Sequence, residues 1–235
     1  MRFSLMPTRL IPARLILPGP PWRKAQAVAQ SLAWSVLLGA ALLALLQQSA
    51  ARASVQSPFT PDFTVAGSAI GSSFGFAVAP AGDINADGYD DLIVGAYLKR
   101  PDSQQVYIYP GSATGLTSTA FFSATGDTAG DFFGYSVDGG GDVNGDGVDD
   151  FLVGAYEAGI TTDTTKVGLV YVYHGAAGVL PSLALTLTGE EPGAKFGFSV
   201  AMAGDVNGDG FDDVIVGAWQ YGAGNAMGRV YLYHG

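Results

Sequence analysis

The sequence contains no cysteine and few charged residues. Asp, Glu, Lys and Arg make up 14% of its 235 residues, compared with about 25% in an average globular protein. Without cysteine, no disulfide can brace an exported form of the chain. Beyond residue 53, only five Lys and Arg accompany 21 Asp and Glu. This acidic part would repel phosphate groups and anionic lipid, which disfavours nucleic acid as a partner and favours divalent cations.

The sequence also lacks an apolar run of the length that usually spans a membrane. Its longest uncharged apolar run, residues 32–46, has 15 residues, and a spanning helix needs about 20. A short apolar run behind basic residues, followed by Ala-Arg-Ala at 51–53, is typical of a secretory signal. We expect residues 1–53 to form a signal helix that is cleaved after Ala53, leaving a secreted or cell-surface domain over 54–235. An uncleaved membrane anchor is the alternative.

Glycine, in contrast, is abundant, with 34 residues, and apolar residues make up 48% of the chain. This composition indicates many short strands joined by tight turns and excludes an all-helical protein. The chain aligns with itself in three copies that begin with Phe-Gly and end with Gly-Ala, at residues 74–96, 133–155 and 196–218. A second motif, VYIYPG, VYVYHG or VYLYHG, follows each copy. Spacings of this length indicate a repeat architecture.

Each copy has the pattern of four short antiparallel strands. In the third copy, apolar and other residues alternate over 196–204, as in a strand, and residues 213–218 form a continuous apolar strand. VYLYHG gives a third strand. The fourth strand is seen in the second copy, at residues 183–189. Four such strands without a helix form a propeller blade. The sequence therefore predicts an all-β protein after the signal helix, a partial or open β-propeller with three blades at about 62–116, 117–180 and 181–235.

The third copy ends before a fourth strand. Residues 61–67 precede the first copy as residues 183–189 precede the third, so they could pair with the third copy and close the arrangement. Three blades fall below the usual range for a closed propeller, which begins at four. We therefore expect self-association or additional blades.

A polar loop between the first two strands of every copy has the pattern D-x-N-x-D-G-x-D-D. Calcium takes six to eight oxygen ligands, and alternate side chains of a tightly curled loop can point inward together. The glycine permits the turn, and the carbonyl of the seventh residue can add a ligand. An EF-hand is excluded because its twelfth position, which must be Glu, is valine here. We expect three Ca²⁺ sites, with ligands from Asp83, Asn85, Asp87, Tyr89 and Asp91; Asp142, Asn144, Asp146, Val148 and Asp150; and Asp205, Asn207, Asp209, Phe211 and Asp213.

The alternative for these loops is a set of Asx turns, in which Asp and Asn side chains cap their own backbone. Three or more carboxylates within nine residues would repel one another without a counter-ion, which favours the calcium hypothesis. The eighth residues of the loops, Asp90, Asp149 and Asp212, are expected to point outward.

With these motifs, the chain resembles the FG-GAP repeats of the integrin alpha-subunit β-propeller and its bacterial relatives. The resemblance covers about residues 62–235 and rests on the Phe-Gly start, the calcium loop and the Gly-Ala end. It implies a propeller, usually of seven blades, with calcium in the loops of one face, at the positions above, and ligand contacts mainly on the other face. The chain departs from the family in having three repeats, and in Tyr97, Tyr156 and Trp219 where proline often follows Gly-Ala.

These features predict a calcium-binding module for adhesion or recognition of a protein or glycan. In a meander, the loops opposite the calcium loops share one face, where Tyr97, Tyr156, Trp219 and Tyr221 either anchor a ligand or cover the core. A hydrolase or lyase on a propeller scaffold is an alternative. It is disfavoured because cysteine is absent and the two histidines occupy equivalent repeat positions, so we expect no catalytic residues. A truncated, non-functional product is a third hypothesis, since the chain stops directly after VYLYHG.

Overall fold

The computed structural model describes residues 61–235 except 68–70, 99–103, 160–165 and 223–226. The chain divides into two units, residues 1–60 and 61–235. The expected signal helix belongs to the first unit and lies outside the described residues. Within the described ranges, no helix is long and apolar enough to cross a membrane.

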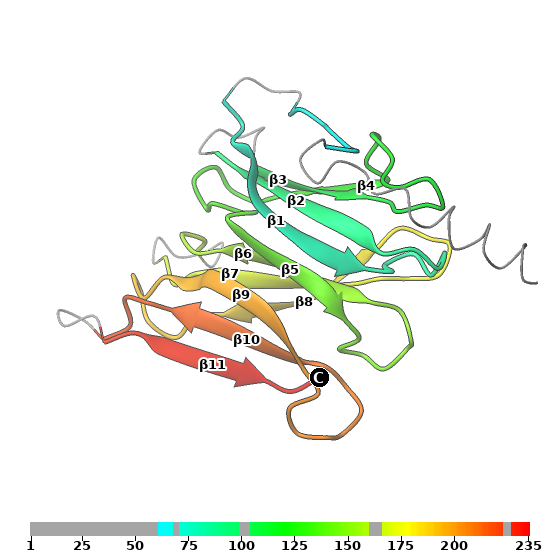
Figure 1. Ribbon diagram of the computed structural model, residues 1–235. Coiled ribbons are helices and arrows are strands. Elements are labelled where there is room, and N and C mark those ends of the chain that lie inside the picture. Colours follow the sequence, from blue (N-terminus) through cyan, green and yellow to red (C-terminus); the bar gives the residue numbers. More distant parts are fainter. Residues whose placement is uncertain (1–60, 68–70, 99–103, 160–165, 223–226) are drawn as a thin grey trace, which may run out of the picture. The chain divides into compact units, whose positions relative to one another are not determined.

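Three antiparallel sheets make up the described unit, and the strands of each sheet follow one another in sequence order (Figure 1). The predicted all-β fold of three propeller blades is therefore confirmed. The first two sheets have four strands, and the third has three among the described residues. The strands are β1 (Phe74–Gly82), β2 (Asp91–Tyr97), β3 (Gln104–Tyr109) and β4 (Phe122–Thr125); β5 (Ser136–Gly141), β6 (Asp150–Ala155), β7 (Leu169–His174) and β8 (Ser182–Thr188); and β9 (Phe196–Gly204), β10 (Asp213–Ala218) and β11 (Arg229–Tyr233).

The apolar cores lie between the sheets. One core joins the first sheet to the second, and another joins the second to the third. The second strand of each sheet has apolar residues on both faces, and in β6 every residue is buried. This pattern explains the continuous apolar runs in the sequence, because a blade in the middle of a stack must bury both faces.

The face that each sheet turns toward the next one carries four aliphatic side chains at equivalent repeat positions; we call it the forward face. In the first two sheets the next sheet covers these side chains, and their exposed fraction does not exceed 8%. In the third sheet they are largely uncovered, with Val206 58%, Val230 67% and Leu232 44% exposed. The equivalent sets are Ile84, Ile93, Val106 and Ile108; Val143, Leu152, Val170 and Val172; and Val206, Ile215, Val230 and Leu232.

Residues 61–67 differ from the expectation. They form no strand, so they do not close the third sheet within the chain. Instead they lie on the first sheet, where the ring of Phe63 packs edge-on against Tyr109 at 5.9 Å between ring centroids. The side chain of Phe122 on β4 packs against Tyr173 of the second sheet at the same distance. The segment therefore lies on the first sheet as β4 lies on the second. The difference is that β4 pairs with β3, the third strand of its own sheet, whereas residues 61–67 have no such third strand beside them among the described residues.

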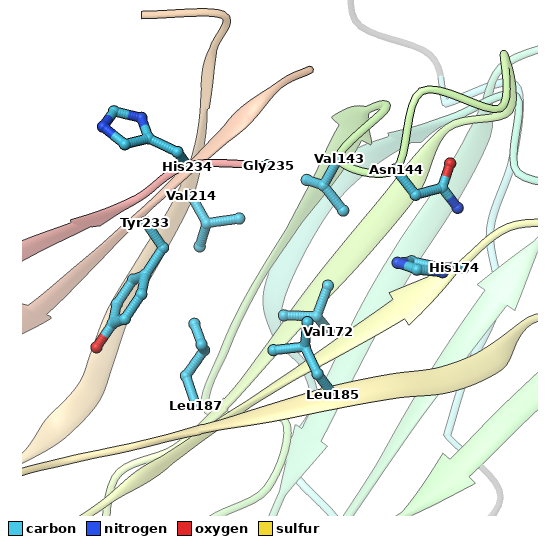
Figure 2. A pocket seen from close by; sticks show the side chains of 10 residues that line it. All are labelled: Val143, Asn144, Val172, His174, Leu185, Leu187, Val214, Tyr233, His234 and Gly235. Atoms are coloured by element: carbon cyan, nitrogen blue, oxygen red, sulfur yellow. The ribbon is translucent and has the colours of Figure 1, made fainter. Parts of the chain in front are cut away.

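A cavity of about 270 Å³ opens between the second and third sheets. Figure 2 shows Val214 and Tyr233 on one side of it, facing Val172 and Leu187 on the other. The equivalent space between the first two sheets is filled by aromatic rings. There Phe151 stacks on Tyr173 with ring centroids 4.8 Å apart.

The repeat alignment explains this cavity. Phe151 pairs with Tyr173 in the second sheet, and Val214 pairs with Tyr233 at the same register in the third. Likewise, Phe122 stands opposite Ile108 and Leu185 opposite Val172. Smaller side chains therefore occupy the positions of two phenylalanines, and cores do not close such gaps completely.

We predict that Val214→Phe stabilises the chain by about 1 kcal/mol, because the new ring can stack on Tyr233 and fill the cavity. In a domain of this size, this corresponds to a rise of about 2–4 °C in the melting temperature, measured by calorimetry. The matched variant Val214→Ala should lower the melting temperature. A lower melting temperature for Val214→Phe would contradict this account of the cavity.

Candidate metal centre and ligand surface

The loops after β1, β5 and β9 lie at one end of the sheets (Figure 1). In each loop, the first aspartate turns back over the loop and accepts hydrogen bonds from its backbone. The carboxylate of Asp142 accepts from the N–H groups of Gly145 at 2.7 Å, Asp146 at 3.1 Å and Gly147 at 2.7 Å. Asp205 repeats these three bonds, and Asp83 accepts from the fifth and sixth residues of its loop. The loops therefore share one curled conformation.

The last aspartate of each loop is buried and ties the loop to the end of the third strand. Asp150 Oδ2 accepts from Val143 N–H at 2.9 Å, and its Oδ1 accepts from Gly175 N–H at 3.0 Å. Burial raises the pKa of Asp150 to about 6, and it raises that of Asp91 to about 6 as well. A raised pKa means that the surroundings do not compensate the negative charge fully, and a bound cation would do so.

The eighth loop residues were expected to point outward, but two of the three reach back to the preceding sheet. Asp149 reaches back to the first sheet, where its Oδ2 accepts from Asp83 N–H at 2.7 Å. Asp212 makes the same bond to Asp142 N–H of the second sheet at 3.0 Å. We call Asp149 and Asp212 the crossing carboxylates. They join three consecutive loops into one hydrogen-bonded chain.

A glycine makes room for each crossing carboxylate. Gly82, immediately before Asp83, has a φ of 73°, and a Cβ placed on it would lie 2.2 Å from Asp149 Oδ2. Any side chain at this position would therefore displace the carboxylate as well as strain the backbone. The Gly-Asp pair that opens each of the first two loops is thus a contact point between blades.

Aromatic side chains form a continuous row at the opposite end of the sheets. The ring of Tyr135 lies 5.0 Å from Phe76, 4.6 Å from Tyr156 and 5.0 Å from Phe198, centroid to centroid. Phe76 and Trp219, at the two ends, are each 51% exposed. The aromatic row comprises Phe76, Tyr97, Phe132, Tyr135, Tyr156, Phe198 and Trp219.

Three of the four aromatic residues predicted for this face, Tyr97, Tyr156 and Trp219, belong to the row. The fourth, Tyr221, instead lies under the guanidinium of Arg229, 3.5 Å from its ring centroid. The other four members of the row, Phe76, Phe132, Tyr135 and Phe198, were not predicted from the sequence. Phe76, Tyr135 and Phe198 occupy the third position of each Phe-Gly-aromatic start. Their repetition was the available signal.

The residues that precede Phe-Gly have an uncommon backbone conformation. Ser73, Phe132 and Lys195 have φ values of 52°, 60° and 62°, in the left-handed region that non-glycine residues seldom adopt.

The side chain of Lys195 lies beside the aromatic row. Its Nζ is 5.5 Å from the ring centroid of Tyr156 and forms an ion pair with Glu157. A basic group therefore already contacts the aromatic row from within the chain.

Comparison with known proteins agrees with this geometry. The family model of the FG-GAP repeat matches residues 74–109, 133–173 and 196–233. The chain is an FG-GAP repeat protein. Each match begins at the Phe-Gly pair and ends on the third strand of a sheet, so each FG-GAP match covers the first three strands of one sheet.

Integrin alpha subunits are among the similar proteins. The chain is 31% identical to integrin alpha-8 of Mus musculus over 167 residues, which cover 70% of this chain and 15% of that protein. It is 33% identical to integrin alpha-4 of Xenopus laevis over 67% of this chain and 15% of that protein. It is 34% identical to integrin alpha pat-2 of Caenorhabditis briggsae over 68% of this chain and 14% of that protein. The chain thus spans about one seventh of the length of these relatives.

The donor set of the FG-GAP loops suits calcium. Asp, Asn and a backbone carbonyl supply only hard oxygen ligands, as Ca²⁺ prefers. The side-chain oxygen of Asn85 is shielded from solvent and accepts no hydrogen bond among the described residues, and such an atom needs a partner. No group of three or more acidic or histidine side chains in the described residues is gathered tightly enough to hold a metal ion. Here the carboxylates accept backbone hydrogen bonds, as Asx turns do, and calcium binding stays a prediction.

We predict that a chelator lowers the melting temperature of the chain. At millimolar Ca²⁺ and extracellular-type affinities, each site would add about 0.4–1.4 kcal/mol to the free energy of unfolding. Asp87→Ala, Asp146→Ala and Asp209→Ala should each remove about one third of the calcium-dependent shift, measured by calorimetry with and without chelator. Asp62→Ala, which removes an exposed carboxylate outside the loops, should retain the full shift. Identical melting curves with calcium and with chelator would contradict the prediction.

Proposed function

We propose that this FG-GAP chain is a calcium-stabilised recognition module that acts outside the cell, as a secreted or cell-surface protein, and binds a protein or glycan through the aromatic row. The similarity to integrin alpha subunits supports an adhesion or recognition role. The single observation that carries the proposal is the aromatic row itself, which runs across all three blades at the end opposite the acidic loops.

The chemistry of the row favours ligand binding. Tyr and Trp provide a large contact area with a polar tip, and they are enriched at the points where binding energy concentrates. The hydroxyl of Tyr156 is protonated at neutral pH, as that of any Tyr with an ordinary pKa of about 10 is, so it can donate a hydrogen bond; burial raises its pKa further, to about 12. The exposed rings of Phe76 and Trp219 would make first contact with a partner.

Calcium has a structural role in this proposal. The crossing carboxylates link the loops at one end, and the rings touch across the blades at the other. Cations bound in the loops would hold the blades in register and so maintain the row. The alternative function, a hydrolase or lyase, has less support, because the loop carboxylates already accept hydrogen bonds from backbone N–H groups.

We predict that Trp219→Ala and Phe76→Ala each weaken binding at least tenfold, because each removes a half-exposed ring at one end of the aromatic row. The measurement is a screen of the full chain, with calcium, on a glycan array and on immobilised extracellular matrix proteins, followed by titration of the positives. Leu180→Ala is the matched control: its side chain is 61% exposed and lies outside the row, so binding should be unchanged. Binding that survives loss of both rings would contradict the proposal.

A further inference from the structure

We propose that a second copy of this chain docks head to tail on the third sheet, where its residues 63–67 become a fourth strand beside β11. This inference does not rest on the ligand proposed above, but it involves the two ends of the same aromatic row: the equivalents of the Tyr135–Phe198 and Tyr156–Phe198 contacts would place Phe76 of one copy against Phe198 and Trp219 of the other. It rests on two surfaces of one chain that match each other at four separate points.

The first point is the uncovered forward face of the third sheet. Val206, Val230 and Leu232 are largely exposed, although the equivalent residues in the other two sheets are buried by a following sheet. The first sheet presents the opposite half of such a contact, on which Val78 is 62% exposed while Val94 and Tyr109 are 3% and 5% exposed. Val78 is equivalent to Val137 and Val200, which pack against the preceding sheet. An apolar face of this kind requires a partner, and a first sheet from another copy has the matching surface.

The second point is the free end of the chain of crossing carboxylates. Asp83 and Asp142 each donate their N–H to the carboxylate of the next sheet. The equivalent N–H of Asp205 has no acceptor among the described residues, and the equivalent carboxylate, Asp90, is exposed. Beside Asp205, Gly204 has a φ of 69° and open space where the carboxylate would enter. Asp90 of a second copy would complete the bond.

The third point is the side chain of the seventh loop residue. Phe211 of the third sheet packs on the loop of the second, where a Cβ on Gly145 would lie 2.5 Å from its ring. The equivalent of Gly145 in the third loop is Gly208, which has a φ of 77° and nothing within 4 Å of its Cβ position. Tyr89, the seventh residue of the first loop, is 44% exposed. Tyr89 of a second copy would cover Gly208.

The fourth point is the strand itself. Residues 63–67 already lie on the first sheet in the place that β4 takes on the second, as the matching contacts of Phe63 and Phe122 show. A Cβ placed on Gly67 would lie 2.6 Å from Phe74 Cβ, and a Cβ placed on the equivalent Gly126 would lie 2.5 Å from Phe133 Cβ. The segment is thus held in position, and no strand of the described residues pairs with it. A strand edge of this kind pairs readily with an open edge on another molecule.

The register of the proposed pairing follows from the repeats. Thr125 stands opposite Gln105 in the first sheet, and Thr188 stands opposite Leu169 in the second. The equivalent pair is Ala66 of one copy opposite Arg229 of the other. Gly126 and Gly189 donate backbone hydrogen bonds at the next position, so Ala66 and Arg229 would form a non-hydrogen-bonded pair, with Cα atoms about 4.5 Å apart.

Because the chain has no cysteine, disulfide trapping can test this register. Full-length chains carrying Ala66→Cys are mixed with chains carrying Arg229→Cys, with calcium and mild oxidant. The spacing of the pair suits a disulfide, so we expect a mixed cross-linked dimer. The matched control combines Thr64→Cys with Arg229→Cys, which moves one thiol by two residues along the same face, and it should cross-link at least tenfold more slowly. Equal rates for the two combinations would overturn the proposal.

Two further measurements separate the outcomes. A chain that carries both Ala66→Cys and Arg229→Cys should form dimers or longer chains; an intramolecular disulfide in the monomer would overturn the proposal. Asp90→Asn should weaken self-association at least tenfold in sedimentation experiments while leaving the melting temperature of the monomer unchanged, because Asp90 has no partner within the described part of its own chain. Unaltered self-association of Asp90→Asn would count against the proposed contact.

Discussion

Each sheet of this protein has apolar side chains on both faces, and it can bury them only against another sheet. The cores consequently lie between blades, and a single blade has no interior of its own. The contrast between Val143, which is 8% exposed, and its equivalent Val206, at 58%, measures what a following blade contributes. Stability is therefore a property of neighbouring pairs, as in other repeat proteins.

Polar contacts specify how the blades stack. The apolar faces alone would allow the sheets to slide, whereas the bond from Asp83 N–H to Asp149 fixes one end of the interface to within a hydrogen-bond length. The aromatic row fixes the opposite end, where rings of successive blades touch. The same loop that would hold calcium thus also sets the position of the next blade. If the loops bind a cation, this arrangement connects that binding to the surface proposed for ligand recognition.

Much of the fold could be predicted from the sequence because the repeats mark their own strands. Continuous apolar runs such as 213–218 and alternating segments such as 196–204 became β10 and β9 as expected. The direction of Asp149 could not be predicted, since its partner belongs to another repeat and its position depends on stacking. For the same reason residues 61–67, which have a strand-like pattern, form no strand where no third strand lies beside them. Local pattern determines the blade, and the neighbouring blade determines the contacts.

The central claim, that crossing carboxylates link each loop to the next blade, can be tested by amide hydrogen exchange. At a protein concentration low enough to keep the chain monomeric, the account predicts slow exchange of the N–H groups of Asp83 and Asp142, because each donates to a carboxylate of the following sheet. The N–H of Asp205 is the internal reference, as no carboxylate of the described chain reaches it, and it should exchange rapidly. Equal exchange rates at all three positions would contradict the claim.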